Sequence, residues 1–152
     1  MKRLIITSIV LLAGISGEAM AVDCSASTRI PNGTAGGALA TLIQGKTVCA
    51  MLGSDKWQEF HSGASEGANN LIDWKMGSGH AVDPTGPVGS WSTSGTGNSS
   101  RVKYNYGSGG LFSYEVHGAN TYVEGATYTF CGDPGAPTLD VILRSGQVSC
   151  GF

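Results

Sequence analysis

Alternation of apolar and polar side chains over residues 101–117 constrains the fold more than any other feature of the chain. In the two runs 101–106 and 111–117, every second residue is aromatic or β-branched: Val102, Tyr104, Tyr106, Phe112, Tyr114 and Val116. A period of two with apolar residues on one side is typical of half-buried antiparallel strands. Four turn residues, Gly107-Ser108-Gly109-Gly110, separate the two runs. The pattern therefore predicts a β-hairpin with one aromatic face.

Turn residues recur along the rest of the chain and divide it into further short runs. We predict strands at residues 47–51, 56–61, 69–76, 88–93, 101–106, 111–117, 127–131 and 139–144. One short helix is expected over residues 34–44, capped by Thr34 and ended by Gly45. About eight strands with an aromatic inner face predict an all-β fold, a small antiparallel up-and-down barrel. A two-sheet β-sandwich is the alternative.

The first residues are typical of a secretory signal peptide. Lys2 and Arg3 supply the positive region, residues 4–15 are apolar, and Ala19-Met20-Ala21 supplies the cleavage pattern. The apolar run is too short to span a bilayer, so we expect no stable membrane insertion. We predict a signal peptide over residues 1–21, a single β domain over residues 22–152, and a secreted or periplasmic location.

All four cysteines, Cys24, Cys49, Cys131 and Cys150, follow the predicted cleavage site. An even number of cysteines in an exported chain of this size predicts two disulfides. The spacing contains no C-x-x-C pair, which disfavours redox catalysis and a zinc ribbon. Shorter loops favour Cys24–Cys49 with Cys131–Cys150, and the nested pairing Cys24–Cys150 with Cys49–Cys131 is the main rival.

The charge balance argues against partners that require a basic surface. The chain has nine Lys and Arg residues against eleven Asp and Glu residues. A nucleic-acid binder needs a basic stripe, so no nucleic-acid partner is expected. Plentiful Gly and few charged residues fit an extracellular β protein with many tight turns. No cofactor is predicted.

The aromatic inner face is the candidate ligand site. We expect it to contain Trp74, Trp91, Tyr104, Tyr106, Phe112, Tyr114, Tyr128 and Phe130. Such a set either fills a core or lines a cavity, in which buried tyrosine hydroxyls would need hydrogen-bond partners. The residues proposed to bind a small apolar or aromatic ligand are Trp74, Trp91, Tyr104, Tyr106, Tyr114 and Tyr128.

Two resemblances follow from short motifs. Gly89-Ser90-Trp91 is a G-x-W motif that opens a strand, and Arg144 lies on the last strand. In these residues the chain resembles lipocalin-like (calycin) barrels, in which the G-x-W tryptophan packs beneath a basic residue. That family has the motif on its first strand, whereas here it lies near mid-chain. The stretch over residues 57–95 also looks like small exported bacterial proteins of uncharacterised function, a resemblance that implies no activity.

Glu59, His61 and Asp73 are candidates for a metal site or a catalytic relay. Glu59 and His61 lie two residues apart and share one face of a predicted strand, and Asp73 follows on the next strand. Carboxylates and imidazole are ligands for zinc, and a histidine can activate a serine. The spacing matches no known metal or hydrolase motif. Polar residues that alternate along a strand are typical of its solvated outer face, which is the expectation here.

Three functions are compatible with these features. The favoured one is a non-catalytic exported binding module, for a small apolar or aromatic ligand or for a protein partner. The alternative is a surface or matrix subunit that associates with itself through Trp57 and Ile142, which simple alternation places on outer faces. A hydrolase or metal-dependent enzyme that uses Glu59, His61 and Asp73 ranks third.

Overall fold

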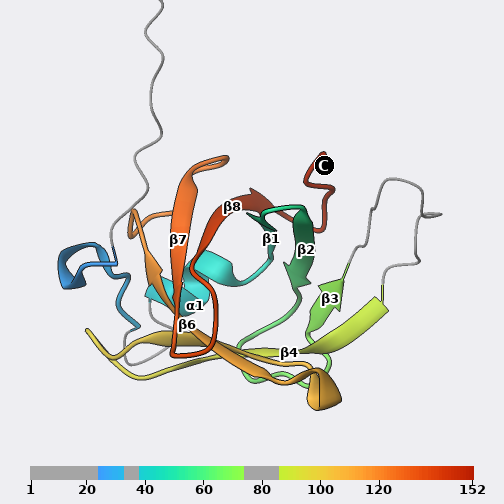
Figure 1. Cartoon of the computed structure of the whole chain (residues 1–152), viewed down its shortest axis with the longest axis horizontal. Coiled ribbons are helices and arrows are strands. Elements are labelled where there is room, and N and C mark those ends of the chain that lie inside the picture. The colour runs from blue at the N-terminus through green and yellow to red at the C-terminus, as the bar shows by residue number, and fades with distance from the viewer. Residues whose placement is uncertain (1–23, 33–37, 74–85) are drawn as a thin grey trace, which may run out of the picture.

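The computed structural model describes residues 24–32, 38–73 and 86–152 (Figure 1). Eight antiparallel strands form a closed barrel in which each strand pairs with its neighbours in sequence and β8 pairs with β1. The strands are β1 (Lys46–Leu52), β2 (Asp55–His61), β3 (Leu71–Asp73), β4 (Gly86–Ser94), β5 (Arg101–Asn105), β6 (Leu111–His117), β7 (Thr127–Gly132) and β8 (Leu139–Ser145). The predicted all-β barrel is confirmed, and the β-sandwich alternative is wrong.

The hairpin predicted from alternation is β5–β6, joined by a 3-10 turn over Gly107–Gly109. Its aromatic residues and valines point into the barrel because successive side chains on a strand alternate between the two faces of a sheet. The other predicted strands occur within about two residues of their expected bounds, except β3. That strand covers Leu71–Asp73: residues 69–70 of the predicted stretch precede it outside any strand, and residues 74–76 lie outside the described residues.

A short helix, α1 (Ala38–Ile43), closes one end of the barrel. Its Leu39, Leu42 and Ile43 side chains are buried in the barrel core, and the helix contacts β1, β4 and β5. Figure 1 shows this helix in cyan within the ring of strands. The predicted end of the helix at Gly45 is confirmed, since Gly45 takes a φ of +70° that favours glycine. The proposed cap, Thr34, lies outside the described residues.

The opposite end of the barrel is called the mouth here. β1 follows α1 directly, so strand direction places the β1–β2 and β5–β6 turns, the end of β3 and the start of β4 at the mouth. Near α1 the interior is packed with large side chains that are almost fully inaccessible to water: Leu71, Trp91, Val102, Val116, Tyr128, Phe130 and Leu143. The half of the barrel nearest α1 is therefore a filled core.

Two disulfides attach the chain ends to the outer wall of the barrel, in a pairing that differs from both favoured ones. Cys24 bonds to Cys131 on β7, with Cα atoms 6.1 Å apart. Cys49 on β1 bonds to Cys150, with Cα atoms 5.7 Å apart. The argument from short loops was wrong because the folded barrel, rather than loop length, decides which cysteines meet. Each disulfide joins a terminal segment to a strand distant in sequence.

The N-terminal segment also enters the barrel core. Ile30 donates its backbone N–H to the carbonyl of Val116 at 2.8 Å, beyond the point where β5 stops pairing with β6. Its side chain is fully buried in the core. The segment thus continues the sheet beside the end of β6, and its first turn is a 3-10 helix over Ala26–Thr28.

The closed eight-stranded barrel is compatible with a lipocalin-like architecture. Gly89 of the G-x-W motif is required by packing, because a Cβ atom there would lie 2.3 Å from the backbone oxygen of Asn105. Trp91 lies on the inner face of β4, whereas alternation places Arg144 on the outer face of β8. The packing of the tryptophan beneath this basic residue, implied by the resemblance, is therefore not found. Among the described residues no helix has the length and hydrophobicity needed to cross a bilayer.

Candidate functional site

Two tyrosines of the β5 segment reach across the barrel interior to β2. The Tyr104 hydroxyl lies 3.0 Å from Nε2 of His61, and the Tyr106 hydroxyl lies 2.8 Å from each carboxylate oxygen of Glu59. β2 and β5 are not neighbours in the sheet, since β3 and β4 lie between them. These contacts therefore span the interior and form a polar layer above the filled core.

Glu59 lies on the inner face of β2, so the expectation of a solvated outer position is wrong. Its side chain is only 8% exposed. Within the described residues its carboxylate accepts hydrogen bonds from Tyr106 alone. Burial raises the pKa of Glu59, the Tyr106 hydrogen bond lowers it and the nearby Asp73 raises it, and together these effects bring the pKa to about 7. Glu59 is thus a buried acid that titrates near neutral pH.

Asp73 stands beside Glu59 on the neighbouring strand. The two residues are direct partners in the register of β2 and β3, so their side chains share the inner face. Two like charges placed side by side disfavour each other unless a proton or a cation lies between them. The predicted proximity of Glu59 and Asp73 is therefore found, and it occurs at the mouth rather than on an outer wall.

His61 is fully buried, and both ring nitrogens are engaged. Nδ1 lies 3.2 Å from the Glu59 carbonyl oxygen, which can only accept, so Nδ1 carries the hydrogen and Nε2 accepts from Tyr104. Burial lowers the pKa of His61 to about 3, which keeps the ring neutral. A neutral imidazole with both nitrogens occupied is a poor base for a serine. Within the described residues no three His, Cys, Asp or Glu side chains are arranged to hold a metal ion.

The tyrosines act as hydrogen-bond donors in an aromatic wall. Burial raises the pKa values of Tyr104, Tyr106 and Tyr114, and the charge of Glu59 adds to this effect, so all three phenols stay protonated. The Tyr104 and Tyr106 rings are stacked with centroids 6.3 Å apart, and Phe112 meets Tyr106 edge-on at 5.8 Å. These ring contacts fix the orientation of the tyrosine side chains and so the positions of their hydroxyls.

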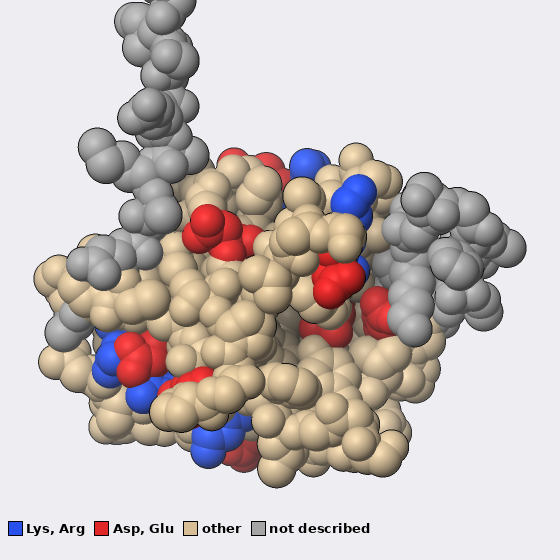
Figure 2. Space-filling view, in the orientation of Figure 1, with Lys and Arg blue, Asp and Glu red and all other residues tan. Residues whose placement is uncertain are grey.

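The mouth itself combines aromatic and acidic side chains. Trp57, two residues before Glu59 on β2, is partly buried and packs against the core, as do Tyr106 and Phe112. Figure 2 shows acidic side chains over β2 and β3 beside a hollow in this face of the molecule. The buried Glu59 and its partner Tyr106 thus lie at the end of the barrel where partly buried aromatic side chains pack against the core.

The structure separates the residues that the sequence proposed for ligand binding. Tyr104, Tyr106 and Tyr114 lie together in the wall around Glu59. Trp91 lies deep in the core, where its Nε1 donates to the Ser62 carbonyl at 3.3 Å. Tyr128 is buried on β7, and its hydroxyl donates to the carbonyl of residue 121 at 3.3 Å. Trp74 lies outside the described residues.

Sequence reasoning missed that the polar residues of β2 and the aromatic residues of β5 form one site. Along β2 both faces mix polar and aromatic residues, so alternation alone does not say which face is inside. The several tyrosines predicted on the inner face did indicate polar residues inside the barrel, since buried hydroxyls require hydrogen-bond partners. Those partners proved to be Glu59 and His61.

A separate groove of about 460 Å³ lies on the outer wall of β4, β5 and β6. Its lining includes Ser92, Lys103, Asn105 and Ser113, together with Leu111, which is 77% exposed. The side chains that alternation places there are short and polar, apart from Lys103 and Leu111. No buried charged group faces this groove among its described lining residues, so the mouth is the stronger candidate site.

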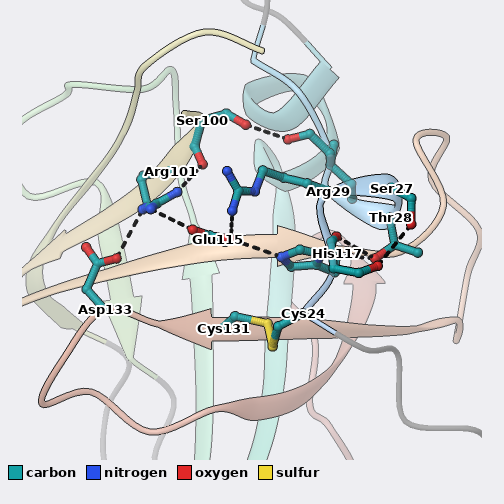
Figure 3. A network of polar contacts seen from close by, with 12 residues as sticks. Cys24, Ser27, Thr28, Arg29, Ser100, Arg101, Glu115, His117, Cys131 and Asp133 are labelled. Carbon is teal, nitrogen blue, oxygen red and sulfur yellow. Dashed lines mark hydrogen bonds and ion pairs between the residues drawn. A yellow bond between two sulfur atoms is a disulfide. The ribbon is translucent and has the colours of Figure 1, made fainter. Parts of the chain in front are cut away.

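A partly buried carboxylate, Glu115 on β6, belongs to an ion-pair network on the outer wall (Figure 3). Glu115 pairs with Arg29, with Arg101 at 2.6 Å and with Nε2 of His117 at 3.3 Å. Arg101 also donates to Asp133 at 3.1 Å. Because Arg29 belongs to the N-terminal segment, the network fastens that segment to the barrel beside the Cys24–Cys131 disulfide.

Comparisons with protein families, with curated proteins and with solved structures gave no match to this chain.

Proposed function

We propose that this chain is an exported, non-catalytic binding module that holds a small molecule at the mouth of its barrel. The observation that carries the proposal is the buried Glu59 carboxylate, which lies among partly buried aromatic side chains at the mouth and has one hydroxyl as its hydrogen-bond donor. Binding sites for small molecules are typically concave and apolar with a few convergent polar groups. A buried acid whose pKa lies near 7 fits that description.

Export is part of the proposal. Residues 1–21 have the pattern of a cleaved leader, and residues 22–152 would then form the mature domain. Both disulfides fit an oxidising compartment, either the periplasm or the exterior of the cell.

The self-association alternative has less support. The prediction that Trp57 lies on an outer face is wrong, because Trp57 packs against the interior core. Of the two predicted anchors, Ile142 remains on the outer wall, 37% exposed. In the described barrel β1 pairs with β8, so the sheet closes on itself and leaves no free edge between these strands for a second copy.

Native mass spectrometry of the protein purified from the periplasm without reductant tests the proposal. We expect a monomer with the mass of the disulfide-bonded domain from residue 22 and a discrete added mass. That added mass should be absent from the Glu59→Ala variant and present in the Asp140→Ala variant, whose acidic side chain lies on the outer wall. A bare monomer would contradict a small-molecule ligand, and a ladder of bare oligomers would favour the structural subunit.

A further inference from the structure

We propose that the mouth binds an organic cation, a small molecule whose ammonium group lies at Glu59 and Asp73 while its apolar part contacts the aromatic wall. This inference rests on the proposed function, because it names the chemical class of the ligand for the same site.

The charges around Glu59 are unbalanced among the described residues. Glu59 is 8% exposed, and Asp73 is its cross-strand partner on the same face. Within the described residues neither a lysine nor an arginine pairs with Glu59. Lys56 on β2 alternates to the outer side, where its Nζ lies 5.4 Å from the Phe152 ring centroid. Among the described residues no basic side chain compensates the charge of Glu59, so there a proton or a ligand can supply the positive charge.

The aromatic rings near Glu59 favour a positively charged ligand. Ring faces carry a negative electrostatic potential and attract ammonium groups, most strongly where water is excluded. Tyr106, Phe112 and Trp57 supply three rings in the half of the barrel that contains Glu59. A carboxylate beside aromatic rings is complementary to an ammonium group attached to an apolar body, and it repels an anionic ligand.

The oxygen and nitrogen ligands at the mouth fit an organic cation better than a metal ion. Calcium takes six to eight oxygen ligands, and zinc sites use three or four protein ligands. The described part of the chain contains no group of three His, Cys, Asp or Glu side chains that could hold a metal ion. An ammonium group needs fewer acceptors, and the aromatic rings replace part of its hydration.

The test compares two probes of the same shape that differ in charge, 2-phenylethylammonium and 2-phenylethanol, by isothermal titration calorimetry at pH 8. We expect the ammonium to bind the wild-type protein at least about tenfold more tightly than the alcohol, a range typical of one charged hydrogen bond. Glu59→Gln should abolish this preference. Asp73→Asn should reduce it, and Asp140→Asn, which removes the same charge from the outer wall, should leave it unchanged.

Three results would overturn the inference. One is equal binding of the two probes, and another is a preference for the ammonium that survives Glu59→Gln in protein with a native near-ultraviolet circular dichroism spectrum. Both would leave a small-molecule site standing. The third is no binding of either probe: if native mass spectrometry then shows a neutral or anionic ligand, the ligand class alone is wrong, whereas a bare monomer would contradict the proposed function as well.

Discussion

Two glutamates, the buried Glu59 in the barrel interior and the partly buried Glu115 on the outer wall, have opposite surroundings. Glu115 meets two arginines and a histidine, so its charge is compensated within the fold. Glu59 meets a tyrosine hydroxyl and a neighbouring aspartate, and no cation within the described residues compensates it. A paired buried charge serves to hold segments together, whereas an unpaired one is a feature of functional sites.

The largest expected effect comes from removing the charge of Glu115. Glu115→Gln leaves Arg29 and Arg101 mostly buried without their shared counter-charge, and we expect the free energy of unfolding to fall by about 3 kcal/mol. Urea denaturation at pH 7 measures this. A loss below about 1 kcal/mol would mean that the network is no more than a set of surface ion pairs.

The matching substitution at Glu59 should act in the opposite direction. The pKa of Glu59 is raised from 4.5 to about 7 in the folded protein, so the folded state holds its proton more tightly than the unfolded state. Stability from this group is therefore present below pH 4.5 and is lost as the pH rises to 7. We expect Glu59→Gln to be about 2 kcal/mol more stable than the wild type at pH 8 and nearly equal to it at pH 4.

The comparison between Glu59→Gln and the wild type requires denaturation curves at both pH values. If Glu59→Gln is destabilised at pH 8 by as much as Glu115→Gln, then the charge of Glu59 is compensated within the fold and the contrast between the two glutamates fails.

A smaller effect is expected from Tyr106→Phe, which removes the hydroxyl that donates to Glu59. At pH 8 the carboxylate would lose its donor, at a cost of about 1–2 kcal/mol, and the cost should shrink at pH 4. Tyr114→Phe is the matched control, because the Tyr114 hydroxyl has no hydrogen bond among the described contacts. Equal losses in the two variants would argue against a specific bond to Glu59.

The smallest effect should follow Asp133→Asn at the edge of the outer network. The Asp133 side chain is 43% exposed, and Arg101 keeps its pair with Glu115. We expect a change below about 0.5 kcal/mol in urea denaturation. A change as large as that of Glu115→Gln would show that the network depends on all of its members.

The sequence predicted the strands of this barrel better than its site. The hairpin of β5 and β6 follows from strict alternation of aromatic and polar residues, and the structure confirms it. Along β2 the alternation places Trp57, Glu59 and His61 on one face, and a tryptophan beside two polar residues does not reveal which face is inside. The hydrogen-bond partners of His61 and Glu59 are Tyr104 and Tyr106, which lie across the barrel. They are 43 and 47 residues away in the sequence, too far for a local pattern to reveal them.

The disulfide pairing could not be predicted from the sequence for a similar reason. Cys24 bonds to Cys131 and Cys49 bonds to Cys150, at sequence separations of 107 and 101 residues. An argument from loop closure describes the unfolded chain, in which short loops close most easily. The native pairing instead reflects where the two terminal segments lie on the outer wall of the finished barrel.

The most direct test of the central claim, that the charge of Glu59 is left for a ligand, is an NMR titration of its side-chain carboxyl carbon. We expect a pKa of about 7 in the free protein and a lower pKa in the presence of saturating 2-phenylethylammonium, because a bound cation favours the ionised carboxylate. A pKa near 4.5 in the free protein would show that the fold already compensates this charge. A raised pKa that the ammonium leaves unchanged would show that the cation does not bind at Glu59.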